Sequence, residues 1–243
     1  LELPRTEARL REAGFGPERF TARRMNFAGL PALASELGPF DGILADLGLS
    51  SMQIDNPSRG FTFKEDGPLD LRMNPQRGRP AADLLAELSA EALAELFREN
   101  ADEPQAEALA RDLAALPQRP RTTRALADQL RATLADLGYE RQDPEVRRTL
   151  QRCFQALRIA VNDEFGVLDQ FLASLPRALA SGGRVAILTF HSGEDRRVKK
   201  AFLEGHRAGL YTAIADSPER PSPQERHDNP RSAPAKLRWA VRS

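Results

Sequence analysis

The chain has 243 residues, with 35 basic and 35 acidic side chains and therefore no formal net charge. Apolar residues make up 41% and charged residues 29%, which is typical of a folded protein and excludes a disordered one. The single cysteine, Cys153, excludes a disulfide framework and a multi-cysteine metal site, and no apolar run reaches the ~20 residues of a membrane span. We therefore predict a cytoplasmic protein without a membrane segment or a bound metal.

The first 80 residues have the pattern of alternating helices and strands. A helix is predicted over residues 4–13 and ends at Gly14, and a strand follows at about 19–25. A short helix carries Leu30, Leu33 and Leu37 on one face. Residues 41–48 then form the short apolar run expected of a strand that is buried on both faces.

From Pro80 onward the pattern becomes purely helical. Residues 81–116 and 122–137 place leucines at helical spacing and contain no strand signal. We predict an inserted helical subdomain over residues 74–142, which divides a core made of residues 1–73 and 143–243.

The last hundred residues return to alternating elements. A helix begins at Asp143-Pro144, is interrupted at 162–166, and continues to Gly182-Gly183. Residues 184–190 are the clearest buried strand, a helix follows over 194–204, and two further strands are expected at 211–215 and 236–241. A helix followed by a buried strand is half of a parallel crossover unit, so the fold class is α/β with a doubly wound, mostly parallel sheet.

Two segments follow buried strands and are rich in polar groups. Ligands bind beyond the carboxyl ends of strands in an open parallel sheet, which selects residues 46–55 and 191–196. Asp46 can accept a hydrogen bond from an amine or hydroxyl, or it can cap the next helix. Ser192 and Asp195 have the spacing of a capping box, which explains both of them but leaves His191 as a structural or a catalytic residue.

The segment from Gly60 to Met73 has the composition of a functional loop. Phe61 and Phe63 can stack a base or anchor the loop to the core. The candidate substrate-binding residues are those two aromatics, three charged residues of the same loop, and two residues that follow the last buried strand: Phe61, Phe63, Asp66, Asp70, Arg72, Ser192 and Arg196.

Four ordered blocks now support a family resemblance. Residues 41–53, 59–73, 154–162 and 182–199 resemble the bacterial small-subunit ribosomal RNA cytosine-N4 methyltransferases, the MraW/RsmH family. The resemblance implies a class I, Rossmann-like fold that uses S-adenosyl-L-methionine, with a helical insertion that recognises the substrate. It also implies methyl transfer to the exocyclic N4 of a cytosine in 16S ribosomal RNA. Small-subunit ribosomal RNA or the assembling small subunit would be the partner, and a homodimer is compatible with the sequence.

The resemblance also assigns roles to individual residues. Asp46 and Gln53 match cofactor-contacting positions, Phe27 matches the residue against the adenine, and Glu2 falls at the acidic position that holds the ribose. For catalysis we expect Asp46 to orient the cofactor or the amine and His191 to accept the proton.

The chain departs from the family pattern in two places that matter. It starts at what should be the second strand and lacks the first strand with its Gly-Gly-His loop, and Gly193 stands where the family usually has Leu. Either an N-terminal segment lies outside this chain, or the protein is a degenerate relative. Two alternative functions therefore stay open: a non-catalytic RNA- or ribosome-binding relative, and an amino-methyltransferase acting on DNA or a small molecule.

The neutral net charge hides an uneven distribution. Residues 81–116 carry two basic and nine acidic side chains, whereas residues 117–158 carry nine and five, and residues 184–243 carry twelve and seven. We predict that the two positive segments bind an RNA backbone. The first of them contributes Arg119, Arg121, Arg124, Arg147 and Arg148.

Overall fold

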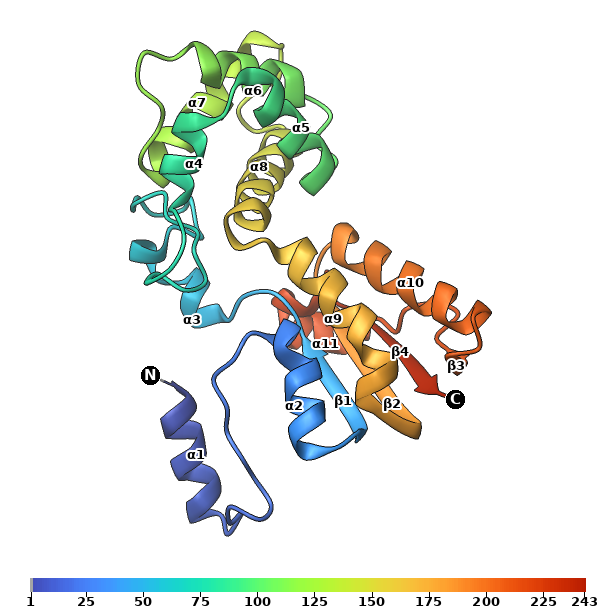
Figure 1. Ribbon diagram of the computed structural model, residues 1–243. Coiled ribbons are helices and arrows are strands. Elements are labelled where there is room, and N and C mark those ends of the chain that lie inside the picture. Colours follow the sequence, from blue (N-terminus) through green and yellow to red (C-terminus); the bar gives the residue numbers. More distant parts are fainter. Residues whose placement is uncertain (1) are drawn as a thin grey trace.

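The structure is a computed structural model that describes residues 2–243. It has an N-terminal α/β part, a helical part and a C-terminal α/β part (Figure 1). In chain order the elements are α1 (Glu2–Glu12), η1 (Phe27–Gly29), α2 (Leu30–Leu37), β1 (Phe40–Asp46), α3 (Ser51–Ile54), η2 (Pro57–Arg59), α4 (Ala81–Glu87), α5 (Ala90–Ala101), α6 (Ala106–Ala115), α7 (Thr123–Asp136), α8 (Pro144–Asn162), α9 (Glu164–Ala178), β2 (Leu179–Thr189), α10 (Ser192–Arg207), β3 (Tyr211–Ile214), α11 (Pro223–Asp228), η3 (Pro230–Ser232) and β4 (Lys236–Arg242).

The sheet has four strands in the order β1-β2-β4-β3. β1 and β2 are parallel, with Asp46 opposite Leu188, so both strands end at the same edge of the sheet. β4 is antiparallel to both β2 and β3. The sheet is therefore mixed within residues 2–243, and its single parallel pair carries the carboxyl ends at which a ligand site is expected.

Helices cover one face of this sheet. α9 and α10 pack on it with α2 at their side, and the core between them contains Leu175, Val185, Ile187 and Phe202 (Figure 1). The other face is open around β1, where the side chain of Leu44 is 74% exposed. β1 was expected to be buried on both faces, and this prediction is wrong for the described residues because no element covers its second face.

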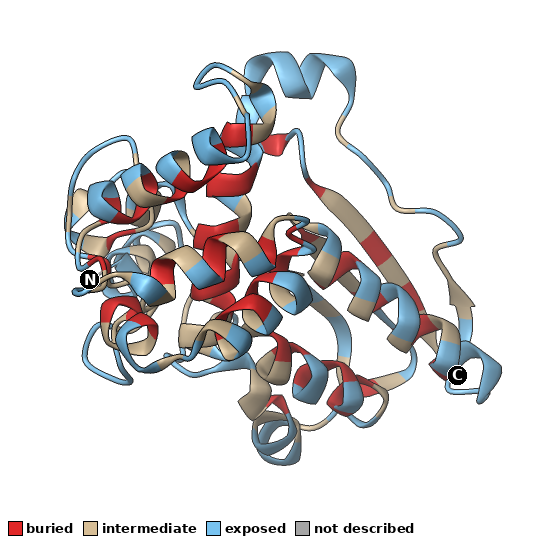
Figure 2. Ribbon diagram, turned by 90° about the horizontal axis from the view of Figure 1, so that it is seen from above, coloured by how far each residue is buried: buried red, intermediate tan, exposed pale blue. Residues whose placement is uncertain are grey.

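The helical part has a hydrophobic core of its own. That core runs from Leu69 through α4–α7 to Leu157 in α8, and Figure 2 shows the buried positions gathered where the helices meet. The buried face of α8, from Val146 to Leu157, thus packs with the insertion, although α8 lies after the boundary predicted at residue 142. The division at residues 74 and 142 stays a prediction.

One joint connects the helical part to the rest. α8 ends at Asn162, and Asp163 adopts a left-handed conformation with φ 49°, so that α9 starts in a new direction. The Asn162 amide donates to the carbonyl of Leu71 at 2.8 Å and accepts from the backbone N–H of Met73 at 2.7 Å. An interruption within the predicted range 162–166 is confirmed, but it is confined to Asp163, since Asn162 ends α8 and Glu164 begins α9. The Asn162 contacts hold the loop 60–73 against the end of α8.

The N-terminal segment contradicts two further predictions. Residues 19–25 form no strand, and no strand within residues 2–243 pairs with them. Glu2 does not end a strand: it begins α1, is exposed, and pairs with Arg5 at 2.9 Å. Among residues 2–243, no helix combines the length and the apolar character that crossing a bilayer requires.

Candidate functional site

A groove of about 990 Å³ lies at the carboxyl ends of β1 and β2, and we call it the strand-end groove. Asp46 closes β1 at its rim, and the segment after it lines one side. The side chain of Asp46 is exposed, and no hydrogen bond or ion pair within residues 2–243 engages its carboxylate. At Gly48 the backbone turns with φ +91°, a conformation that favours glycine. The Asp46 carboxylate, which is available as a hydrogen-bond acceptor, thus lies two residues before a glycine at which a ligand can approach the backbone closely.

Gln53 holds the segment after Gly48 in place. Its amide oxygen accepts from the backbone N–H of Ser50 at 3.0 Å, while the Ser50 hydroxyl accepts from the Gln53 N–H at 3.3 Å. This reciprocal capping box fixes the short helix α3, and Ser50 and Ser51 line the groove whereas Gln53 does not. The cofactor contact predicted for Gln53 remains a prediction.

His191 lines the strand-end groove from the end of β2. Its ring lies 6.0 Å from the ring of Phe165, its side chain is only 10% exposed, and both ring nitrogens are buried. Nε2 is 3.3 Å from a carboxylate oxygen of Glu194, although neither ring nitrogen forms a well-aligned hydrogen bond. The structure therefore places His191 at the groove but directs its ring nitrogens into the protein.

Glu194 is a buried carboxylate behind His191. It also accepts from the backbone N–H of Phe190 at 2.9 Å. Burial on its own raises the pKa of Glu194, but the contacts with His191 and with the Phe190 N–H outweigh burial and hold the pKa below its ordinary value. Glu194 is therefore ionised at neutral pH and faces the imidazole as an anion.

Glu164 completes a cluster with His191 and Glu194 whose ligand atoms all lie within 4.8 Å of one another. These are groups that can bind a metal ion. However, the Arg158 guanidinium donates to both oxygens of Glu164, at 2.7 and 2.9 Å. Because an arginine already neutralises this carboxylate, the cluster is explained as an ion-pair network that joins α8 to the start of α10.

The capping box expected at Ser192 and Asp195 is absent. His191 occupies the N-cap of α10 and its side chain makes no capping hydrogen bond. Asp195 instead accepts from Arg238 at 2.7 Å and from Lys236 at 3.1 Å, both on β4. The prediction is wrong because α10 begins one residue earlier than the capping box requires, with His191 at the N-cap, and because Arg238 and Lys236 engage the Asp195 carboxylate.

The other residues predicted at this end of the sheet are dispersed. Phe27 is 40% exposed and packs edge-to-face on Phe171 of α9 at 5.3 Å, outside the residues that line the strand-end groove. Ser192 is exposed at the first turn of α10, and Arg196 pairs with Asp102 of the helical part at 2.6 Å. Glu2 lies in α1 and contributes nothing to the groove lining. The contacts predicted for Phe27, Ser192 and Arg196 remain predictions.

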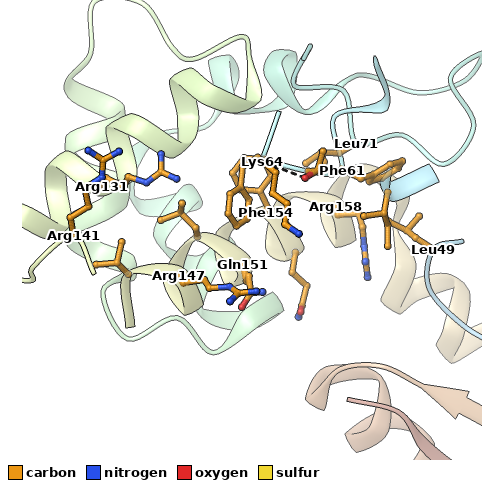
Figure 3. Close-up of a pocket in the computed structure, with 16 residues that line it drawn as sticks. Leu49, Phe61, Lys64, Leu71, Arg131, Arg141, Arg147, Gln151, Phe154 and Arg158 are labelled. Atoms are coloured by element: carbon orange, nitrogen blue, oxygen red, sulfur yellow. Dashed lines mark hydrogen bonds between the residues drawn. The ribbon is translucent and has the colours of Figure 1, made fainter. Parts of the chain in front are cut away.

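A second groove, of about 690 Å³, continues from the first along α8, and we call it the helical groove (Figure 3). Phe61 and Phe63 line it, and both also pack on the helical core, with Phe63 5.2 Å from Phe154. The anchoring interpretation is confirmed, whereas the stacking of a base on Phe61 or Phe63 stays a prediction. Its basic lining residues are Lys64, Arg131, Arg141, Arg147 and Arg158.

The charged residues of the same loop make structural contacts. Asp66 accepts from the backbone N–H of Arg124 at 3.1 Å, and this contact above all lowers the pKa of Asp66. Asp70 and Arg72 form a two-point ion pair at 2.7 and 2.8 Å, which lowers the pKa of Asp70. None of the three lines either groove, and the substrate contact predicted for them remains a prediction.

The predicted arginine cluster does not form one surface. Arg119 donates to the carbonyls of Leu85 and Leu88, and Arg121 pairs with Asp83 at 3.0 Å. Of the five predicted arginines, only Arg147 lines a groove. Charge counting found the segment but not the side chains, because Asp83 of α4 pairs with Arg121, Glu145 of α8 pairs with Arg148, and Arg119 is bound to backbone carbonyls.

Sequence reasoning missed Gln151, Gln155 and Arg158, which line both grooves. A signal for them exists, since they share one side of α8 at helical spacing. The apolar positions of α8 predict its core face, and the polar positions beside that face form a second pattern that predicts a surface for ligands.

Gly193 provides a test of how tightly His191 is held. A Cβ at Gly193 would lie 2.6 Å from Cζ of Phe165 and 3.2 Å from Nδ1 of His191. We expect Gly193→Leu to lower the free energy of unfolding by about 1–3 kcal/mol, because the added side chain overpacks this wall. Phe165→Leu in the same chain should recover most of that loss, which urea denaturation of both single variants and the double variant measures.

The control for this cycle is Gly42→Ala in β1, where an added Cβ meets no atom within 4 Å. That variant should leave the free energy of unfolding almost unchanged. Strictly additive effects of Gly193→Leu and Phe165→Leu would contradict the contact between the two positions.

Comparison with known proteins identifies the family of this chain. Residues 3–243 match the model of the MraW methylase family. The chain is 48% identical to "Ribosomal RNA small subunit methyltransferase H 1" of Lachnoclostridium phytofermentans, over 100% of this chain and 67% of that protein. It is 49% identical to "Ribosomal RNA small subunit methyltransferase H 2" of Alkaliphilus metalliredigens. It is 50% identical to "Ribosomal RNA small subunit methyltransferase H 1" of Agathobacter rectalis. Each match covers 100% of this chain and 70% of the relative. The chain therefore belongs to the MraW methylase family, and with it to the class I α/β methyltransferase fold that its motifs predict.

Proposed function

We propose that this protein is an S-adenosyl-L-methionine-dependent methyltransferase that modifies the exocyclic N4 of a cytosine in 16S ribosomal RNA. The observation that carries the proposal is the strand-end groove, which brings Asp46 and His191 together at the ends of the two parallel strands. The names of the relatives support ribosomal RNA of the small subunit as the substrate. The helical groove that continues from the strand-end groove supports a large substrate.

The strand-end groove fits the cofactor in part. Its volume of about 990 Å³ lies at the upper end of the range of small-molecule sites, and Asp46 with the bare backbone at Gly48 offers an acceptor and close approach. Bound there, S-adenosyl-L-methionine would supply an electrophilic methyl group on a sulfonium. Glu2 does not reach this groove, so another group must hold the ribose.

Asp46 is proposed to act on the amine. The lone pair of a cytosine N4 amine is conjugated with the ring, which makes the amine a weak nucleophile. A carboxylate that accepts a hydrogen bond from the amine orients it and favours the localised lone pair that the transition state needs. The exposed carboxylate of Asp46, which has no hydrogen bond or ion pair within residues 2–243, supports this proposed role. The target base would have to leave its stack to enter the groove.

His191 is proposed to take up the proton that the amine loses. The anionic Glu194 lies 3.3 Å from Nε2 and would stabilise the imidazolium that results. Because both ring nitrogens are buried, proton uptake requires the ring to turn toward the groove. Arg158 and Glu164 hold the other side of this network in place.

The test is a methyl-transfer assay with full-length protein, labelled S-adenosyl-L-methionine and small-subunit particles. Digestion of the product RNA should yield N4-methylcytidine. Labelled RNA with the methyl group on a ring carbon would overturn the N4 assignment. RNA binding without any transfer would favour a non-catalytic RNA-binding relative, and transfer to DNA or to small amines alone would favour the third alternative.

A further inference from the structure

One side of α8 carries four polar residues at regular helical spacing. Arg147, Gln151, Gln155 and Arg158 follow one another at intervals of four, four and three residues, and they therefore share a face about 16 Å long. All four line both the helical groove and the strand-end groove. We call this surface the α8 polar face, and it forms the boundary along which the two grooves meet.

Three of the four side chains of the α8 polar face are available to a ligand, whereas the fourth, Arg158, is paired with Glu164. Within the described residues, no hydrogen bond or ion pair engages the side chains of Arg147, Gln151 or Gln155. The other three arginines of α8 are occupied, since Arg148 pairs with Glu145, Arg152 with Glu103 and Arg158 with Glu164. On the side that faces the grooves, α8 thus keeps Arg147, Gln151 and Gln155 free within the described residues.

The opposite walls indicate the kind of ligand. Figure 3 shows Arg131 and Arg141 at the far end of the helical groove and Phe61 and Lys64, from the loop 60–73, nearer the strand-end groove. Lysine and arginine bind phosphates, aromatic rings stack on bases, and glutamine amides both donate to and accept from base edges. Base edges and base faces are exposed together only in an unpaired strand.

We propose that the α8 polar face binds a single-stranded RNA segment next to the target nucleotide and guides that segment toward the strand-end groove. In this arrangement Arg147 contacts a phosphate, Gln151 and Gln155 contact base edges, and Arg158 marks the point at which the strand enters the catalytic end. The proposal rests on the proposed function, and it identifies the α8 polar face as the surface that selects the RNA strand.

Arg147 and Arg148 give a matched pair for the test. They are adjacent, exposed and chemically identical, but only Arg147 lines the grooves. Binding of a fluorescently labelled, cytosine-containing single-stranded RNA is measured by anisotropy over a series of salt concentrations. Arg147→Ala should weaken binding about five- to tenfold and reduce the slope of log K against log salt by about 0.7, as expected for one lost phosphate contact. Arg148→Ala should change neither quantity.

The glutamines are tested by the double variant Gln151→Ala/Gln155→Ala. It should bind RNA with an unchanged salt slope but discriminate less between RNA sequences, because amides read bases and carry no charge. A duplex of the same sequence should bind the wild-type protein more weakly than the single strand does. Equal effects of Arg147→Ala and Arg148→Ala, or preference for the duplex, would overturn the proposal.

The failure of this proposal can be distinguished from failure of the proposed function. If the full-length protein transfers no methyl group but Arg147→Ala still binds RNA more weakly than Arg148→Ala, the α8 polar face stands and the enzymatic function does not. If transfer is normal and Arg147→Ala leaves KM for the small-subunit particle unchanged, the function stands and the α8 polar face is refuted.

Discussion

Asp46→Asn is expected to reduce kcat for methyl transfer by about 10²–10³-fold while the free energy of unfolding stays within about 0.5 kcal/mol of the unchanged protein. The loss follows from the proposed role of the carboxylate, since an amide accepts the hydrogen bonds of the amine less strongly and carries no charge. Stability should be preserved because Asp46 is exposed and has no hydrogen bond or ion pair within residues 2–243.

The kinetic parameters separate the two roles predicted for Asp46. A fall in kcat at unchanged KM for both substrates would place the contact in the transition state, whereas a rise in KM for S-adenosyl-L-methionine alone would identify Asp46 as a binding residue. Asp41→Asn is the control, because Asp41 is an exposed aspartate at the other end of the same strand. Similar rates for the Asp46 and Asp41 variants would refute the catalytic role.

Most of the fold can be predicted from the sequence because hydrophobic periodicity marks its elements. The strands at 184–190, 211–215 and 236–241 and the helix pair divided near residue 163 all appear in the structure. Two predictions depended on neighbours and are wrong. Within residues 2–243, the segment 19–25 has a strand-like pattern but no strand beside it, and the apolar β1 has one uncovered face. An apolar pattern predicts a strand correctly only where a neighbouring strand supplies backbone hydrogen bonds.

The candidate site shows a similar limit. The rule that ligands bind beyond strand ends found Asp46 and His191, which line one groove. Local spacing misassigned Asp195, because a capping box and a long-range ion pair use the same residue types. The Arg158–Glu164 pair depends on how α8 meets α9, and that geometry is set by the left-handed turn at Asp163. Helical spacing shows that the residues of the α8 polar face share one side of the helix, but it does not show that this side borders the two grooves.

Asp195 connects α10 to β4 through a buried ion pair, and this makes it the residue whose loss should harm the fold most. Arg238 is 5% exposed, and its guanidinium donates to both oxygens of Asp195, at 2.7 and 3.4 Å. Asp195→Asn should lower the free energy of unfolding by about 3–5 kcal/mol, because it leaves a buried arginine without its counter-charge. Urea denaturation, with the m-value checked for constancy, measures the change.

Asp102→Asn is the matched control, since Asp102 also pairs with an arginine of α10, Arg196, but at the surface with both side chains more than half exposed. It should cost less than about 1 kcal/mol. Equal losses in the two variants would show that burial of the Asp195–Arg238 pair has no energetic consequence.

The same pair predicts how stability depends on pH. Burial raises the pKa of Asp195, but the contacts with Arg238 and Lys236 outweigh it and leave the pKa below its ordinary value. A carboxyl group whose pKa is lower in the folded than in the unfolded protein stabilises the fold above the ordinary aspartate pKa of about 4, and this contribution is lost as the pH falls through the folded-state pKa. The difference in stability between the unchanged protein and Asp195→Asn should therefore be full at pH 7 and shrink below about pH 4. A difference that stays constant down to acid pH would show that the asparagine variant loses packing rather than charge.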